Sequence, residues 1–387
     1  MPAYRFVNCR LCKNGELLST PLTVSDYGYI IPNNPVPPEI LEVDLNNAII
    51  APGFIELQTN GALGFHFANF TDSATYKAGL GTLAQYLPGT GTTAFFPTVP
   101  TVLDGVLHNV LPLLKPAERP DAASILGAHV EGPFIAISRC GAHDPEKMQA
   151  PANSSLESIY GKENLMQSIR LVTLAPELPG ALDYIRNLTK YNIAVSMGHS
   201  AATYDEGVEG MQAGATLLTH CFNGMNPLHH REPGLPGLIT TRSPPYFSII
   251  ADSIHLHPRV VAMAYRSSPS HCILITDSIE LSGLPDGLHP GHAQIPGRQR
   301  KIGNKVVLEG TDTLIGTCIT LDECVRNLMD WANIPLQKAV CCVTENVAEA
   351  VGLEDRGKIE VGRRADFVIL DEAGMVKQTW ILGERVV

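Results

Sequence analysis

The chain has 387 residues, 44% hydrophobic and 17% charged, a composition typical of a compact globular enzyme and not of a disordered segment. Its net charge is −11, from 28 lysines and arginines against 39 aspartates and glutamates, and it lacks the basic runs that bind nucleic acid, so we expect no nucleic-acid partner. With an odd number of cysteines, nine, no secretory signal and no apolar stretch of roughly 18 residues, we expect a cytoplasmic protein without a membrane span.

The two ends of the chain share one pattern. Residues 1–50 contain short alternating runs, YRFVNCRL and LEVDLNNAII, broken by NG, NN and PP turns, and residues from Gly357 onward have the same character. Both patterns are typical of antiparallel strands. We therefore expect residues 1–50 and 357–387 to form one small β-sandwich domain beside a larger domain of residues 51–356.

Eight apolar runs of strand length fill the larger part, most of them followed by a turn and a segment with helical spacing. They are GFIELQ, TTAFFPTV, SILGAHVE, IRLVTLAPE, NIAVSMGH, GATLLTH, FSIIAD and HCILITD. The helical segments are TYKAGLGTLAQYL, LDGVLHNVLPLL, ALDYIRNLTKY, YDEGVEGMQAG and RVVAMAYRSS. Eight β/α units predict a TIM (β/α)8 barrel, in which catalytic residues lie at the carboxyl ends of the strands.

Three of those strand ends carry metal-binding side chains. Glu131 ends one strand at HVEGPF, and His199 and His220 end two consecutive strands. A hydrolytic zinc site takes about three His, Asp or Glu ligands and leaves a position for water. One strand-end polar residue is usually structural, but this combination predicts a single metal ion on Glu131, His199 and His220, either Zn²⁺, which we favour, or Fe²⁺.

Asp277 ends the eighth strand, on the same rim. A carboxylate near a metal-activated water can take its proton and return it to a leaving amine, so we predict Asp277 as the general base and acid. The alternative is an Asp that caps the following turn. The long Gly-, Pro- and His-rich segment from Ser278 to Thr317 follows, and we expect it to form part of the substrate pocket.

Several longer blocks support a family likeness. HVEGPFI, CGAHDPE, GATLLTHCFNGMNPLHHREPG and ITDSIELSGLPDG occur in order between about residues 50 and 371, together with GRRADFVILD, which is common to amidohydrolases. In these blocks the chain resembles the N-acetylglucosamine-6-phosphate deacetylases of the amidohydrolase superfamily. The resemblance implies hydrolysis of N-acetylglucosamine 6-phosphate to glucosamine 6-phosphate and acetate in amino-sugar catabolism, and usually a homodimer.

The resemblance also implies residue roles, and for the metal and for Asp277 they agree with the strand ends. It implies that His143 contacts the acetyl carbonyl, that Asn223 and Gly224 contact the sugar phosphate, and that Arg231 and His255 bind phosphate, Arg231 from across a dimer interface. A surface ion pair for Arg231 and a structural role for His255 are the alternatives. The complete implied substrate-binding set is Ala142, His143, Asn223, Gly224, Arg231, His255, Leu314, Ile315 and Gly316.

Gln58-Thr59-Asn60 stands where many amidohydrolases have an HxH pair for a second metal. Amides are poor ligands for such ions, so we expect the second position to be weak or empty. Two other functions remain open. A cyclic amidase would normally need the two-metal site, and a non-catalytic scaffold would have no reason to retain Glu131, His199, His220 and Asp277.

Overall fold

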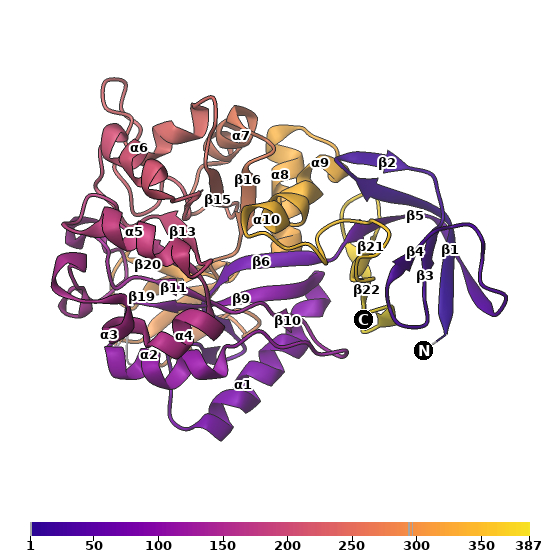
Figure 1. The fold of residues 1–387 in the computed structure, drawn as a ribbon, viewed down its shortest axis with the longest axis horizontal. Helices are drawn as coiled ribbons and strands as arrows, with labels where there is room; N and C mark the ends of the chain where they lie inside the picture. The colour runs from indigo at the N-terminus through magenta and orange to yellow at the C-terminus, as the bar shows by residue number, and fades with distance from the viewer. Residues whose placement is uncertain (1, 293–294, 296) are drawn as a thin grey trace.

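The computed structural model describes residues 2–292, 295 and 297–387. Figure 1 shows a barrel surrounded by helices and, beside it, a smaller β-sheet body that contains both chain termini. The predicted combination of a TIM barrel with a β domain built from the two ends is confirmed.

All eight predicted barrel runs form parallel strands, one of them split into two short pieces. The strands are β6 (Phe54–Thr59), β9 (Thr92–Pro100), β10 (Ser124–Ile125), β11 (Ala128–Glu131), β12 (Ile169–Leu174), β13 (Ala194–Met197), β14 (Leu217–Leu218), β15 (Tyr246–Ile250) and β16 (Cys272–Ile275). Hydrogen bonds from Asp277 N to Gln58 O (2.9 Å) and from Asn60 N to Ser278 O (2.7 Å) connect the last strand to the first. The barrel is therefore nearly closed at its catalytic end.

Helices cover the outside of the barrel, and the five predicted helical segments all form, as α1, α2, α5, α6 and α7. The bounds are α1 (Ser73–Tyr86), α2 (Asp104–Val110), α3 (Leu156–Tyr160), α4 (Lys162–Gln167), α5 (Ala181–Lys190), α6 (Tyr204–Ala213), α7 (Pro258–Ser267), α8 (Leu321–Ala332), α9 (Leu336–Cys341) and α10 (Glu345–Ala350). Helix α6 shows how the sequence sets such bounds: Thr203 and Glu206 form a capping box, and Gly214 ends it at a φ of 120°. None of the described helices is both long and apolar enough to cross a membrane.

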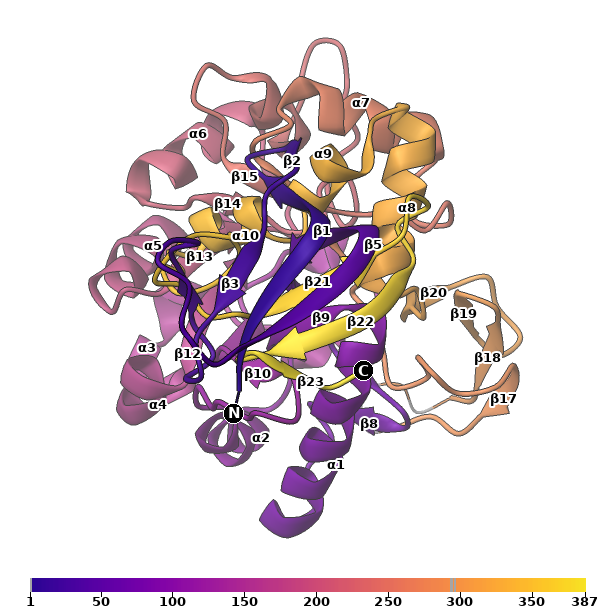
Figure 2. The ribbon, with the colours of Figure 1, turned by 90° about the vertical axis from the view of Figure 1, so that its right-hand side faces the viewer.

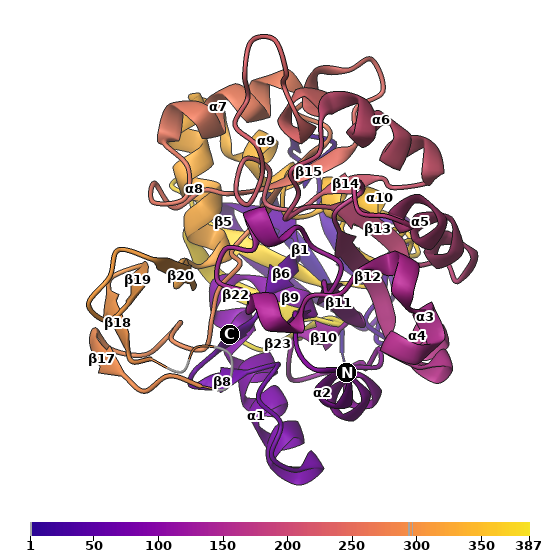
Figure 3. The same cartoon turned by 90° about the vertical axis from the view of Figure 1, so that its left-hand side faces the viewer.

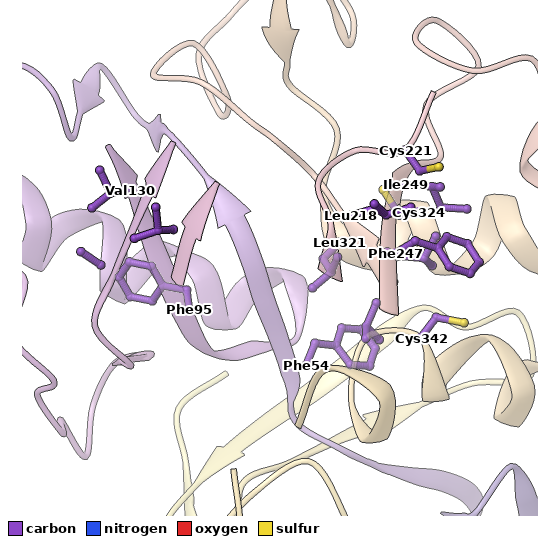
Figure 4. Packing of buried hydrophobic residues seen from close by; sticks show 14 of the residues in the cluster. Phe54, Phe95, Val130, Leu218, Cys221, Phe247, Ile249, Leu321, Cys324 and Cys342 are labelled. Carbon is purple, nitrogen blue, oxygen red and sulfur yellow. The ribbon is translucent and has the colours of Figure 1, made fainter. Parts of the chain in front are cut away.

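Neighbouring residues of each barrel strand enter different cores. Phe95 packs in the outer core, between strands and helices, whereas Phe96 packs with Ile55 and Ile273 in an inner core. Figure 4 shows the outer core, with Phe247 of β15 close to Cys324 of α8. Both faces of these strands are buried, which explains why the sequence shows continuous apolar runs and not an alternating pattern.

The two chain ends form one eight-stranded sheet. Its strands are β1 (Ala3–Lys13), β2 (Glu16–Leu18), β3 (Leu22–Val24), β4 (Ile30–Ile31), β5 (Ile40–Pro52), β21 (Phe367–Leu370), β22 (Val376–Ile381) and β23 (Glu384–Arg385). Antiparallel pairing of β5 with β21 joins the ends (Figure 2). The prediction of antiparallel strands in residues 1–50 is wrong for β1 and β5, which run parallel, because residues 14–39 are long enough to cross back to the start of the sheet.

The rim carries two further β elements. A small hairpin pairs β7 (Gly61–Ala62) with β8 (Phe65–His66), and the segment after β16 forms a four-stranded antiparallel sheet of β17 (Gly287–His289), β18 (Gln299–Ile302), β19 (Lys305–Leu308) and β20 (Leu314–Thr317). Figure 3 shows this sheet projecting beside the barrel. Within the predicted Ser278–Thr317 segment, residues 293, 294 and 296 lie outside the described part of the chain.

Candidate metal centre and active site

Three of the four predicted catalytic strand ends have left-handed backbone. The φ angles are 47° at His199, 31° at His220 and 49° at Asp277, values that residues other than glycine rarely adopt. Each of these residues lies two positions after the last residue of its strand, and its left-handed backbone turns the side chain into the mouth of the barrel. Strain of this kind persists only where surrounding contacts enforce it, and it is concentrated at functional sites.

The predicted metal ligands come together. The Oε1 atom of Glu131 lies 3.0 Å from Nε2 of His220 and 3.3 Å from Nε2 of His199, and the two Nε2 atoms are 3.1 Å apart. All three residues are at most 7% exposed. Gly224 makes this approach possible, because a Cβ there would lie 2.9 Å from Nδ1 of His199.

The protonation of the two imidazoles shows that these atoms fit a cation. Nδ1 of His199 lies 2.7 Å from the Arg139 carbonyl oxygen, and Nδ1 of His220 lies 3.2 Å from that of Asn223. A carbonyl only accepts, so each Nδ1 carries a proton and donates it, and in its neutral form each ring directs the lone pair of Nε2 at the other ring and at the Glu131 carboxylate. Converging lone pairs and a carboxylate repel one another unless a positive ion lies between them, and backbone acceptors behind the rings are typical of histidine ligands.

Glu131 is fully buried, which by itself raises its pKa. Positive charge at the Nε2 positions of His199 and His220 outweighs burial and holds the pKa of Glu131 well below its usual value, and a cation bound at the same place acts in the same direction. Gln58 Nε2 donates to Glu131 Oε1 at 3.1 Å and lies 3.3 Å from Asp277 Oδ1, while Asn60 Nδ2 donates to Asp277 Oδ1 at 2.7 Å. The amides at the position of the missing HxH pair thus orient the two carboxylates through hydrogen bonds.

Asp277 faces the metal ligands from β16. Burial, and next the negative charge of Glu131, raise its pKa to about 6. Its backbone N–H donates to the Gln58 carbonyl, and its Oδ1 accepts from Asn60, so both the backbone and the carboxylate of Asp277 are held against the first strand. This geometry suits a group that takes up and releases a proton near neutral pH.

His143 lies beside the ligands but is protonated on the other nitrogen. The Thr101 backbone N–H donates to its Nδ1 at 3.3 Å, so a neutral His143 carries its proton on Nε2, which lies 3.8 Å from Glu131 Oε2. Burial, with a contribution from His199, lowers the pKa of His143 to about 3. His143 is therefore a neutral hydrogen-bond donor and does not offer a lone pair to the ion.

A pocket of about 230 Å³, open to solvent, lies over these groups. The other predicted substrate residues that line it, besides His143, are Ala142, Asn223, Gly224, His255, Leu314, Ile315 and Gly316. The φ of Gly316 is 52°, and a Cβ there would come within 2.5 Å of the Ile279 side chain. The rim segment after β16 therefore contributes to the pocket wall, as predicted.

Asp252 is a site residue whose role sequence reasoning missed. Its Oδ2 accepts from Nδ1 of His255 at 2.7 Å, and its Oδ1 accepts the backbone N–H groups of Ile254 and His255. Burial raises the pKa of Asp252, but these contacts outweigh it and the pKa is lowered. The signal was available, since a strand-end Asp followed three residues later by a His in a turn is a typical carboxylate–imidazole pair.

Most polar atoms of Asn223 are already hydrogen-bonded within the chain, which limits the atoms that can contact a substrate. Its backbone N–H donates to the His220 carbonyl, and its Nδ2 donates to the His255 carbonyl at 3.2 Å. Its Oδ1 is buried and has no hydrogen-bond partner among the described residues. The backbone N–H of Asn223 is therefore already engaged, and its side-chain oxygen is the acceptor that remains for a ligand.

Sequence similarity shows the family of the chain. Residues 49–386 match the model of the amidohydrolase family. The chain belongs to the amidohydrolase family. It is 36% identical to an N-acetylglucosamine-6-phosphate deacetylase of Danio rerio, over 100% of this chain and 97% of that protein. The family likeness seen in the sequence blocks is confirmed.

Solved amidohydrolase structures agree with this assignment. The N-acetylglucosamine-6-phosphate deacetylase of Pasteurella multocida superposes with a TM-score of 0.87, at 27% identity over 99% of both chains. A mutant of the Mycobacterium smegmatis deacetylase, solved in complex with N-acetyl-D-glucosamine 6-phosphate, superposes with a TM-score of 0.86, at 28% identity over 100% of this chain and 99% of that one.

Arg231 is the one predicted substrate residue of this amidohydrolase that does not line the pocket. It lies in an exposed loop, residues 227–232, where its backbone N–H donates to the His229 ring. A single chain thus leaves the pocket without that guanidinium, which is the arrangement expected if Arg231 serves a second subunit.

Proposed function

We propose that this amidohydrolase removes the acetyl group from N-acetyl-D-glucosamine 6-phosphate and releases D-glucosamine 6-phosphate and acetate, a step of amino-sugar catabolism. The observation that carries the proposal is one pocket lined by two chemically distinct groups. One is the cation-ready cluster of Glu131, His199 and His220 with Asp277 beside it, and the other is the imidazole of His255. The deacetylases to which the chain is similar support the substrate assignment.

Amidohydrolases depend on metal, and we propose one divalent ion per chain, held by Glu131, His199 and His220. Zn²⁺ is our assignment, and Fe²⁺, which suits the same two-histidine, one-carboxylate set, is the alternative. When bound, such an ion acidifies a water and polarises the acetyl carbonyl. Gln58 and Asn60 support a single ion, because both direct N–H groups at the carboxylates.

Two residues of the chain then act on the amide: His143 as a hydrogen-bond donor and Asp277 as the group that accepts and returns a proton. The Nε2–H of His143 donates to the carbonyl oxygen of the acetyl group and stabilises the negative charge that develops there. Asp277 takes a proton from the attacking water as the carbon–oxygen bond forms. It then gives that proton to the amide nitrogen as the carbon–nitrogen bond breaks, so that glucosamine leaves as an amine and acetate remains.

His255 binds the phosphate, with Asp252 behind its ring to support a positive charge. We place Asn223 and Gly224 beside it. Arg231 of the partner subunit supplies a bidentate guanidinium across the interface of a homodimer. The nine cysteines are all free thiols, which supports a reducing, cytoplasmic location.

Release of acetate tests this function. Purified protein should hydrolyse N-acetylglucosamine 6-phosphate, lose activity with a chelator and regain it with Zn²⁺, and act much more slowly on unphosphorylated N-acetylglucosamine. Equal rates on the two sugars would refute the phosphate assignment. Hydrolysis of a cyclic amide in place of either sugar would favour the cyclic-amidase alternative, and no activity together with no stoichiometric metal would favour the scaffold.

A further inference from the structure

Two hydrogen bonds from one segment hold His199 in its left-handed conformation. The carbonyl oxygen of His199 accepts from the backbone N–H of Ala136 at 2.8 Å, and its Nδ1 donates to the carbonyl oxygen of Arg139 at 2.7 Å. The same segment continues into His143. The orientation of the His199 imidazole therefore depends on where this segment is fixed.

The side chain of Arg139 connects that segment to a second loop. Its Nε donates to Oδ1 of Asn226 at 3.1 Å, and its Nη2 donates to the same oxygen. Asn226 in turn donates from Nδ2 to the carbonyl oxygen of Ala201 at 2.7 Å. Because Ala201 lies two residues after His199, these hydrogen bonds form a closed loop of contacts that begins and ends at His199.

Glu177 fixes the two residues that follow His199. Its Oε2 accepts from the hydroxyl of Ser200 at 2.7 Å, and its Oε1 accepts from the backbone N–H of Ala201 at 2.6 Å. Ser200 is 0% exposed, and its own backbone N–H donates to the Gly224 carbonyl oxygen at 2.9 Å. Glu177 follows β12, so a carboxylate from one strand end holds the turn at the end of the neighbouring strand, β13.

We propose that Arg139, Asn226 and Glu177 are positioning residues that fix the imidazole of His199 for metal binding. The inference rests on the proposed function, in which His199 is a metal ligand. A left-handed histidine keeps that conformation only where surrounding contacts enforce it. None of these three described residues lines the pocket, so their effect on the reaction passes through the ligand.

Zinc affinity tests this inference. The dissociation constant for Zn²⁺ is measured by competition with a chromophoric chelator for wild type, Arg139→Met, Arg139→Lys and Asn226→Ala. Loss of a group that orients a histidine ligand should weaken Zn²⁺ binding about tenfold in Arg139→Met and in Asn226→Ala. Arg139→Lys keeps a cationic donor for Asn226 and should recover most of the loss. Arg186→Met, on α5 with its side chain 55% exposed, is the matched control and should bind as wild type.

A double variant shows whether Arg139 acts through Asn226. If it does, Arg139→Met combined with Asn226→Ala should bind Zn²⁺ about tenfold more weakly than wild type, and not about a hundredfold. Glu177→Gln loses one of its two acceptor oxygens and should also weaken Zn²⁺ binding. At saturating Zn²⁺, Arg139→Met should lower kcat and leave KM within about twofold, because the phosphate contacts are intact. Thermal unfolding of each metal-free variant checks that it is folded.

The outcomes separate this inference from the function itself. Unchanged Zn²⁺ affinity in Arg139→Met and Asn226→Ala would overturn the inference, and so would a loss in Arg139→Lys as large as that in Arg139→Met. A loss of about a hundredfold in the double variant would overturn the connection between Arg139 and Asn226. If wild type binds Zn²⁺ but releases no acetate, the proposed function fails and the affinities still decide the inference. A wild type that binds no Zn²⁺ would overturn both.

Discussion

Replacement of Asp252 by Asn would isolate the role of the charge behind His255. The Asp252 side chain is 0% exposed and its Oδ2 lies 2.7 Å from Nδ1 of His255, which is itself 12% exposed. In the variant the amide can still form a hydrogen bond to the ring, but the negative charge behind the ring is lost. The ring then becomes a weaker hydrogen-bond donor to a phosphate, whose own charge is unchanged.

The size of the effect follows from that change. Loss of the charged partner should weaken that hydrogen bond by about 1–1.5 kcal/mol, so KM for N-acetylglucosamine 6-phosphate should rise about tenfold. The value of kcat should stay within about twofold, because His255 is assigned to the phosphate and takes no part in the proton transfers at the amide. Hydrolysis of unphosphorylated N-acetylglucosamine should not change.

Steady-state kinetics on both sugars provide the assay, and Asp183→Asn, at an exposed position of α5 with its side chain 79% exposed, is the matched control. The control should behave as wild type. A fall in kcat at unchanged KM, or an equal loss on the phosphorylated and unphosphorylated sugars, would refute the assignment of His255 to the phosphate.

Two further predictions concern the base and the subunit interface. The pKa of Asp277 is raised to about 6, and a general base must be deprotonated. In a pH–rate profile, kcat/KM should therefore be retained above about pH 6 and fall as the pH drops through that value, and a bound cation would shift this fall to lower pH. A fall in kcat/KM that begins above about pH 7 would contradict the role of Asp277. If Arg231 acts across a homodimer, Arg231→Ala and Asp277→Asn should each be nearly inactive alone but regain about a quarter of wild-type activity when mixed subunits assemble, since half the dimers are mixed and each has one intact site. No regained activity would mean that Arg231 does not act in trans.

The catalytic strand ends could be predicted because their signal is local. Glu131, His199, His220 and Asp277 each follow an apolar run, and carboxyl ends of parallel strands meet at one rim. What the sequence did not reveal was how the rings are protonated. The ring proton lies on Nε2 in neutral His143 and on Nδ1 in His199. These opposite assignments depend on backbone groups of Thr101 and Arg139, which are far away in the chain.

The parallel pairing of β1 with β5 shows the same limit. Alternation predicts a strand, but the direction of its neighbour depends on the path of the connecting residues, and residues 14–39 allow either. The network of Arg139, Asn226 and Glu177 was also invisible, since its members come from three separate segments.

The sequence by itself determined the eight strands, the outer helices, and the chemical groups at the strand ends, because these depend on periodicity and on residues within a few positions of one another. Only the tertiary structure decided which groups meet. Closure of β16 against β6 brings Gln58 and Asn60 to Asp277. The tertiary structure likewise places Arg231 in an exposed loop outside the pocket of its own chain. Contacts between residues 200 or more positions apart depend on the packing of the whole barrel, which no local pattern encodes.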